Sequence, residues 1–191
     1  LTNPCDVQYS ITGTLAMMIG FGVGLPPLWD IQSGHSGVGV FGLMDQGSNN
    51  GRGIIPAPPD AWSRIYAGWA STINTPNFDK IELKDSLHNQ ILKIPINESE
   101  YFLIENRFRH SGAIYDQKLP ESGILIWHID ETQVRSSYSI DATNQIWLED
   151  PSDPDHQGDR ITAGAAFSTD DNETSFTPST APNSDTEDGS T

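Results

Sequence analysis

The chain lacks the residues on which several classes of protein depend. It has a single cysteine, Cys5, among 191 residues, so neither an internal disulfide nor a CxxC zinc site can form. It has 10 basic residues against 26 acidic ones, a net charge of −16, so nucleic acid or an anionic membrane would repel it. Its most apolar stretch, residues 15–28, is broken by glycines and prolines and falls short of the roughly 18 residues of a membrane-spanning helix.

Signals for targeting are also missing from the printed sequence. The first residue is Leu1 rather than methionine, and no basic segment is followed by an apolar stretch and a cleavage site. We therefore expect the sequence to be truncated at its N-terminus, where a signal peptide would stand.

Glycine and proline, by contrast, are abundant, with 17 and 13 residues, and they divide the first part of the chain into short elements. Thr14 has the side chain of a helix N-cap, and the residues that follow predict a helix over 15–21 that ends at Gly22 and Gly24. Because this helix is apolar on all sides, we expect it to be buried. A second helix is predicted over residues 61–68, with Asp60 as its N-cap.

The pattern changes after residue 76, where apolar and polar residues begin to alternate. Strands are predicted at residues 79–83, 90–96, 101–108, 123–130 and 145–148. The predicted fold class is α+β, in which an antiparallel sheet or sandwich follows the helical part. Three segments result: residues 1–76, a β-rich region over 77–168, and an acidic, largely irregular tail over 169–191.

The end of the chain is strongly acidic. From residue 149 onward, 11 residues are acidic and one is basic, so loop or disorder is the default, although Phe167 and Phe176 predict partial docking. The densest carboxylates are Asp150, Asp153, Asp155 and Asp159. Two interpretations stay open for them: a calcium site, and a solvated acidic loop.

Five segments in a fixed order carry a resemblance to one family: residues 24–30, 37–48, 59–63, 100–107 and 123–131. They are similar to the immune inhibitor A family of secreted bacterial zinc metallopeptidases (peptidase family M-six). For residues 1–76 the resemblance implies the C-terminal part of a metzincin-like peptidase domain, with an active-site helix, a Met-turn loop and a second helix. It also implies an extracellular enzyme that hydrolyses peptide bonds in proteins with the help of zinc.

In that family the active-site helix carries the motif HExxHxxGxxD. Two histidines four residues apart share a helix face and bind one Zn²⁺, the glutamate takes a proton from zinc-bound water, and the aspartate completes the site. Aligned without a gap, the two histidines fall on Met17 and Phe21, the glutamate on Met18 and the aspartate on Pro27. The turn glycine of the motif is kept as Gly24.

None of these replacements preserves the chemistry of the motif. Phenylalanine and proline offer no lone pair to a metal, methionine is a soft thioether that suits Zn²⁺ poorly, and Met18 cannot accept a proton. Met44 falls at the family's Met-turn, where we expect a core methionine beneath the helix. Zinc is therefore not expected to bind, and we predict a pseudoenzyme with a protein or peptide ligand. The alternative is a non-enzymatic, calcium-stabilised extracellular module.

Other residues do not rebuild the lost site. The five histidines have no metal-ligand spacing: His35, His88, His110, His128 and His156. His128 and Asp130 are expected on one face of a strand, where two interpretations stay open: a polar cluster able to support hydrolysis, and a strand end that hydrogen-bonds its following loop. Five aromatic side chains are expected in the core rather than on a ligand platform: Trp62, Trp69, Tyr101, Phe102 and Trp127.

Overall fold

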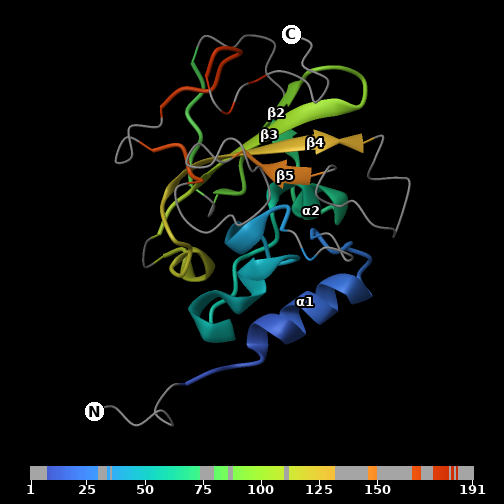
Figure 1. Ribbon diagram of the computed structural model, residues 1–191, viewed down its shortest axis with the longest axis vertical. Coiled ribbons are helices and arrows are strands. Elements are labelled where there is room, and N and C mark those ends of the chain that lie inside the picture. The colour runs from blue at the N-terminus through green and yellow to red at the C-terminus, as the bar shows by residue number, and fades with distance from the viewer. Residues whose placement is uncertain are drawn as a thin grey trace.

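The computed structural model describes residues 8–29, 34, 36–73, 80–85, 88–109, 112–131, 146–149, 165–168, 174–180, 182 and 184. In chain order the elements are α1 (Thr12–Gly22), the 3₁₀ helices η2 (Gly39–Phe41) and η3 (Gln46–Gly53), α2 (Ala61–Tyr66), β1 (Thr72–Ile73), β2 (Ile91–Pro95), β3 (Glu100–Arg107), η5 (Ile114–Asp116), β4 (Gly123–Asp130) and β5 (Ile146–Leu148). Figure 1 shows the sheet at one end of the molecule and α1 toward the other. None of the described helices is long and apolar enough to cross a membrane.

The strands form one mixed sheet in the order β1-β2-β3-β4-β5. The two longest strands, β3 and β4, are antiparallel and pair along their whole length, from Glu100 opposite Asp130 to Arg107 opposite Gly123. The edge strand β1 runs parallel to β2, and the other pairs are antiparallel. The described part of the chain is therefore a mixed α/β fold compatible with the predicted α+β class. The alternative of a two-sheet sandwich is wrong for these residues.

Strand positions agree with prediction except at the start of the β-rich region. The strands β2, β3, β4 and β5 lie within a residue of the predicted bounds. The strand predicted over 79–83 is wrong for residues 80–83, which form no strand, and residues 72–73 supply the edge strand instead. Apolar and polar residues alternate at 80–83, but no strand of the described residues pairs with this segment. The carbonyl of Leu83 instead accepts a hydrogen bond from the side chain of Asn106, at 3.0 Å.

The sheet has two apolar faces, and its larger core lies on the side of the helices. This core joins residues from both sides of position 76, including Leu28, Phe41, Met44, Trp62, Leu103, Leu125 and Trp127. On the opposite face Phe102 and Ile126 pack with Phe167, and Phe176 meets the ring of Phe102 edge-on at 5.0 Å. The prediction that Phe167 and Phe176 dock part of the tail is therefore confirmed.

The helix α1 differs from its prediction in two respects. It begins at Thr12 rather than after Thr14, and it has no side-chain cap at its N-cap residue Ile11. Its only buried residues are Gly13 and Gly20, whereas large side chains such as Leu15 and Ile19 are exposed. The expectation of a fully buried helix is therefore wrong. An apolar composition does not by itself supply neighbours on every side, and α1 has neighbours mainly along its glycine face.

The helix α2 begins where the sequence predicts. The Asp60 carboxylate accepts a hydrogen bond from the backbone N–H of Ser63 at 2.9 Å, and this caps the helix. The helix ends at Tyr66, two residues earlier than predicted, and Gly68 turns the chain with a φ of +74°. Because of this early end, Trp69 is 52% exposed and its prediction as a core residue is wrong, whereas Trp62, Tyr101, Phe102 and Trp127 are buried.

Candidate functional site

Helix α1 lies directly on the loop that contains Met44. A Cβ atom placed on Gly20 would stand 2.5 Å from the Sδ of Met44, and one placed on Gly13 would stand 1.8 Å from the carbonyl oxygen of Ser48. Both distances are far inside van der Waals contact. A side chain at position 13 would collide with backbone, and one at position 20 would require the Met44 side chain to move. Met44 is fully buried beneath the helix, which confirms its prediction as a core methionine.

The end of α1 is shaped by the turn glycine that the sequence singled out. Gly24 has a φ of +93°, the left-handed conformation that glycine adopts most readily. Its backbone N–H donates to the carbonyl of Phe21, and the N–H of Leu25 donates to the carbonyl of Gly20, both at 3.0 Å. The chain thereby reverses over the inner side of the helix, and Leu25 and Leu28 enter the core.

The four positions of the degenerate motif are divided between two sides of this region. Met17 and Phe21 are half-buried and pack against the main core, and the Phe21 ring meets the Trp29 ring edge-on at 6.1 Å. Met18 is exposed, and Pro27 is half-buried in the turn after the helix. The two positions that align with histidine ligands therefore share the inner face. Neither side chain there fits zinc, because one is a hydrocarbon ring and the other a lone thioether.

Directly after Met44, a buried carboxylate organises the loop. The Oδ2 atom of Asp45 accepts the Ser36 hydroxyl at 2.5 Å and the backbone N–H groups of residues 37, 38 and 39 at 3.1, 3.0 and 2.8 Å. Its Oδ1 atom accepts the N–H of Gln46 at 2.8 Å. Burial raises the pKa of Asp45, and these hydrogen bonds offset part of the rise. Asp45 thus fixes the backbone on both sides of the methionine.

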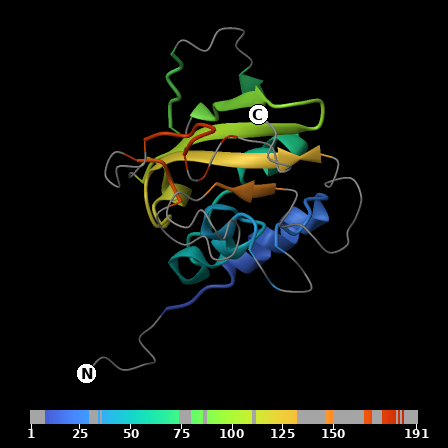
Figure 2. The same cartoon turned by 45° about the horizontal axis from the view of Figure 1, so that its top comes forward.

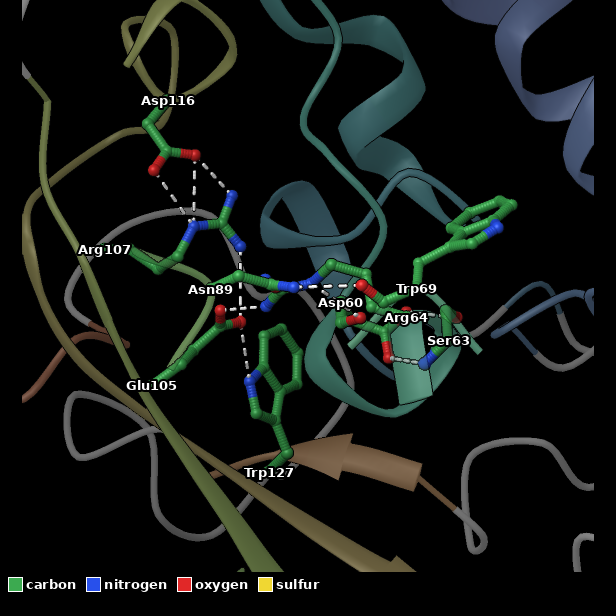
Figure 3. Close-up of polar contacts among 9 residues, drawn as sticks. All are labelled: Asp60, Ser63, Arg64, Trp69, Asn89, Glu105, Arg107, Asp116 and Trp127. Carbon is green, nitrogen blue, oxygen red and sulfur yellow. Dashed lines mark hydrogen bonds and ion pairs between the residues drawn. The ribbon is translucent and has the colours of Figure 1, made fainter. Parts of the chain in front are cut away.

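A second buried polar group lies between the helices and the sheet (Figure 3). The Arg107 guanidinium holds Asp116 in a forked pair, with Nη2 at 2.6 Å and Nε at 3.0 Å from Oδ1. Its Nη1 atom lies 3.3 Å from Oε1 of Glu105, and the same oxygen accepts the indole N–H of Trp127 at 3.0 Å. Burial alone would lower the pKa of Arg107, but Glu105 and Asp116 more than offset it and raise the pKa. We call these residues, with Arg64, the Arg107 network.

Arg64 connects this network to helix α2. One of its guanidinium nitrogens donates to Oε2 of Glu105, and another donates to the side-chain oxygen of Asn89 at 2.7 Å. The Asn89 amide in turn donates to the carbonyl of Trp69 at 3.0 Å (Figure 3). Two arginines thus meet two carboxylates that are each about 2% exposed. The charges balance and solvent is excluded, so the arrangement holds α2 on the sheet rather than presenting a reactive group.

His128 also lies inside the structure, on the side of the sheet that carries Phe102. Its Nε2 atom is 2.8 Å from Oε1 of Glu100, and its Nδ1 atom is 3.0 Å from Oε1 of Glu149. Both ring nitrogens are therefore engaged within the protein, and the Phe102 ring lies 4.4 Å away. Trp127 and Ile129 belong to the core on the other side of the sheet. This geometry ties three strand ends together. Residues 132–145, which follow the strand, lie outside the described residues, so the two interpretations of His128 and Asp130 stay predictions.

Tyr101, Lys93 and Glu131 form a smaller cluster at the end of the sheet. The Tyr101 hydroxyl donates to Oε1 of Glu131 at 2.5 Å, and the Lys93 ammonium stands 3.4 Å from the centre of the Tyr101 ring. Burial and the Glu131 carboxylate raise the pKa of Tyr101, and burial lowers the pKa of Lys93. A hydroxyl whose pKa is raised acts as a hydrogen-bond donor rather than as a base.

Several predicted site residues lie outside the described residues: Asp150, Asp153, Asp155 and Asp159, and with them His35, His110 and His156. The calcium site therefore stays a prediction. Among the residues that the structure describes, no group of three or more His, Cys, Asp or Glu side chains is placed to hold a metal ion.

Comparison of the chain with family models, curated proteins and solved structures finds no match. The resemblance to the immune inhibitor A family therefore rests on the sequence segments and stays a prediction.

Sequence reasoning missed the Asp45 loop and the Arg107 network, although a signal existed for each. Glu105 and Arg107 occupy alternate positions of a predicted strand, on the face that also carries Leu103. Opposite charges at such positions indicate a buried ion pair. Asp45 follows the methionine and lies within three residues of Gly47 and Ser48, a composition that favours side-chain hydrogen bonds to the backbone.

Proposed function

We propose that the chain is a catalytically inactive, metallopeptidase-like module that binds a protein or peptide without cleaving it. One observation carries the proposal: Gly20 of α1 rests on Met44, while Met17 and Phe21 point to the inner side of the helix. In the family that the sequence resembles, a helix presents two histidines above a methionine turn. The contact of α1 with Met44 supports such an arrangement here. The side chains at the positions of the ligands and the base cannot perform the chemistry.

The inactivity follows from the side chains themselves. Peptide hydrolysis of this type needs a metal-bound water and a group that removes its proton. Met18, at the position that aligns with this group, is exposed and has no basic atom. Without metal ligands or a general base, we infer that the fold binds a protein or peptide and does not cleave it. The extracellular location implied by the family resemblance belongs to the same proposal.

Zinc content and proteolysis test the inactivity directly. The purified chain is dialysed against zinc, its metal content is measured by elemental analysis, and casein cleavage is followed with and without a chelator. We expect substoichiometric zinc and no cleavage that depends on a metal. One zinc per chain together with chelator-sensitive cleavage would sink the proposal.

Restoring the motif tests the scaffold. The variant Met17→His, Met18→Glu, Phe21→His and Pro27→Asp returns the family's residues to their aligned positions. Because two of these positions share the inner face above Met44, we expect the variant to bind one zinc ion with four-coordinate geometry by X-ray absorption.

The matched control is Met17→Ala, Met18→Glu, Phe21→Ala and Pro27→Asp, which changes the same four positions without supplying histidines. This control keeps the restored acidic residues but lacks the two imidazole ligands, so it is expected to bind zinc far more weakly. If the restored variant is folded by circular dichroism and binds zinc no better than this control, the metallopeptidase scaffold is the wrong assignment.

A further inference from the structure

The side of α1 that faces away from the core is a continuous apolar surface. Its members are each between 47% and 74% exposed: Tyr9, Ile11, Leu15, Met18, Ile19 and Val23. From Ile11 onward these residues are three or four positions apart or adjacent, which places them along one stripe of the helix. We call this stripe the outer face of α1.

Scattered exposed apolar side chains are ordinary, but this stripe differs in two ways. A helix on the surface of a protein normally turns its large apolar residues inward and its polar residues outward. Here the fully buried residues are glycines, Met17 and Phe21 are half-buried, and the other large apolar side chains of α1 are outside. The stripe also lies in a segment, residues 7–29, that contains no charged residue, although the whole chain has 36 of them.

We propose that the outer face of α1 is the contact surface of a symmetric dimer, in which the α1 helices of two copies of this chain pack against each other. A two-fold contact requires a patch that complements itself, and an uncharged stripe of leucine, isoleucine, methionine and valine does so. Gly22 lies among these residues with open space beside it, and the gap admits a side chain of the opposite helix.

The size of the stripe is sufficient for a specific contact. With about 200 Å² for a large apolar side chain, the exposed fractions amount to on the order of 700 Å² per copy. Two copies would then bury on the order of 1,400 Å², which lies within the range of stable protein interfaces. Figures 1 and 2 both place α1 toward the outside of the ribbon, away from the long strands β3 and β4.

Charge favours this contact over one through most other surfaces. Each copy has a net charge of −16, so two copies repel when their acidic surfaces meet. A contact through α1 brings no carboxylate of residues 7–29 against another. The remaining long-range repulsion is screened by salt, with a Debye length of about 8 Å at physiological ionic strength. The dimer is therefore expected to become tighter, not weaker, as salt is added.

Sedimentation equilibrium over a hundredfold range of chain concentration, at low and at high salt, tests the proposal. We expect a reversible monomer–dimer equilibrium that shifts toward dimer at high salt. The variant Leu15→Gln with Ile19→Gln keeps good helix formers at exposed positions and is expected to weaken the dimer at least about tenfold. The control Ile114→Gln makes the same kind of change at an exposed apolar residue of η5 and is expected to leave the equilibrium unchanged.

Three results would overturn the proposal. The first is a chain that stays monomeric at every concentration and salt, including one that binds neutral lipid vesicles through α1 instead. The second is a dimer that the Leu15→Gln, Ile19→Gln variant leaves intact. The third is a dimer that dissociates as salt is raised, because salt would then be weakening an electrostatic contact rather than screening repulsion. Circular dichroism of the variant in its monomeric form shows whether α1 is kept.

Discussion

Replacement of Arg107 by methionine is expected to remove a large part of the stability of this protein. Arg107 is 1% exposed, and its guanidinium makes the forked contact with Asp116 and a further contact with Glu105. Methionine fills part of the volume but leaves these two carboxylates without that cation inside the protein. Loss of one partner from a buried ion pair costs about 3–5 kcal/mol, because the other charge stays desolvated.

Such a loss is a large share of the total, since domains of this size unfold with about 5–15 kcal/mol. For Asp116 the cost lies at the upper end of the range of about 3–5 kcal/mol, because this carboxylate loses its contacts with both Nε and Nη2 of Arg107. It is smaller for Glu105, which keeps Arg64 and the indole N–H of Trp127. We therefore expect the free energy of unfolding to fall by about 5 kcal/mol in total.

Urea unfolding followed by tryptophan fluorescence measures this loss. The matched control is Arg109→Met, which removes an arginine two residues further along the chain, where its guanidinium donates to the exposed carbonyl of Pro120. The control is expected to cost less than about 1 kcal/mol. In the double variant Arg107→Met, Asp116→Leu both charges are removed together, so its loss should be smaller than the sum of the two single losses. Equal losses for Arg107→Met and Arg109→Met would refute the account of the network.

Two further predictions follow from particular contacts. Gly13→Ala should destabilise the protein by about 2–3 kcal/mol, because its Cβ meets a backbone carbonyl that cannot move aside, whereas Gly20→Ala meets a methionine side chain and should cost less than about 1 kcal/mol. The control Gly22→Ala, with open space around its Cβ, should be neutral or stabilising in the same urea titration. Asp60→Asn should change the pH dependence of stability. Burial raises the pKa of Asp60 above the ordinary value of 3.8, because it disfavours the charged carboxylate. The contribution of the protonated Asp60 to folding stability is therefore complete below pH 3.8 and is lost as pH rises through the raised pKa. The wild type should therefore lose stability relative to Asp60→Asn as pH rises, and a relative gain would contradict the assignment.

Local signals in the sequence were sufficient for some elements. The strand β4 was predicted to the residue because isoleucine, leucine and tryptophan fill its positions and a glycine precedes them. The sequence predicts the start of α2 from Asp60 as its N-cap, and the structure adds that the Ser63 hydroxyl also donates to this carboxylate. In both cases the deciding interaction lies within a few residues of the chain.

Other features depend on partners beyond the reach of local patterns in the sequence. Charges at positions 105 and 107 indicate a buried pair, but nothing local identifies Asp116 in the turn η5 as the partner of Arg107. The exposure of α1 is a similar case, because its composition is apolar on every side and only the tertiary structure decides which side is covered. The glycines at 13 and 20 indicate which side of α1 is covered. Residues seven positions apart share a helix face, and glycine permits a close approach of another segment.

The two proposals concern opposite sides of one helix, except that Met18 belongs both to the motif and to the outer face of α1. They are therefore separated in the variant Met17→His, Phe21→His, Pro27→Asp, which restores the three metal ligands and leaves Met18 in place. Met17 and Phe21 lie on the inner side, against the core, and Leu15 and Ile19 lie on the outer face. If both proposals hold, the Leu15→Gln, Ile19→Gln substitutions should dissociate the dimer of this three-residue variant without removing its zinc. Loss of zinc in that combined variant would mean that the dimer contact holds α1 in place, and the metal site would then require the second copy. Retention of zinc by the monomer would instead show that the glycine contacts with Met44 and Ser48 are sufficient to position the helix.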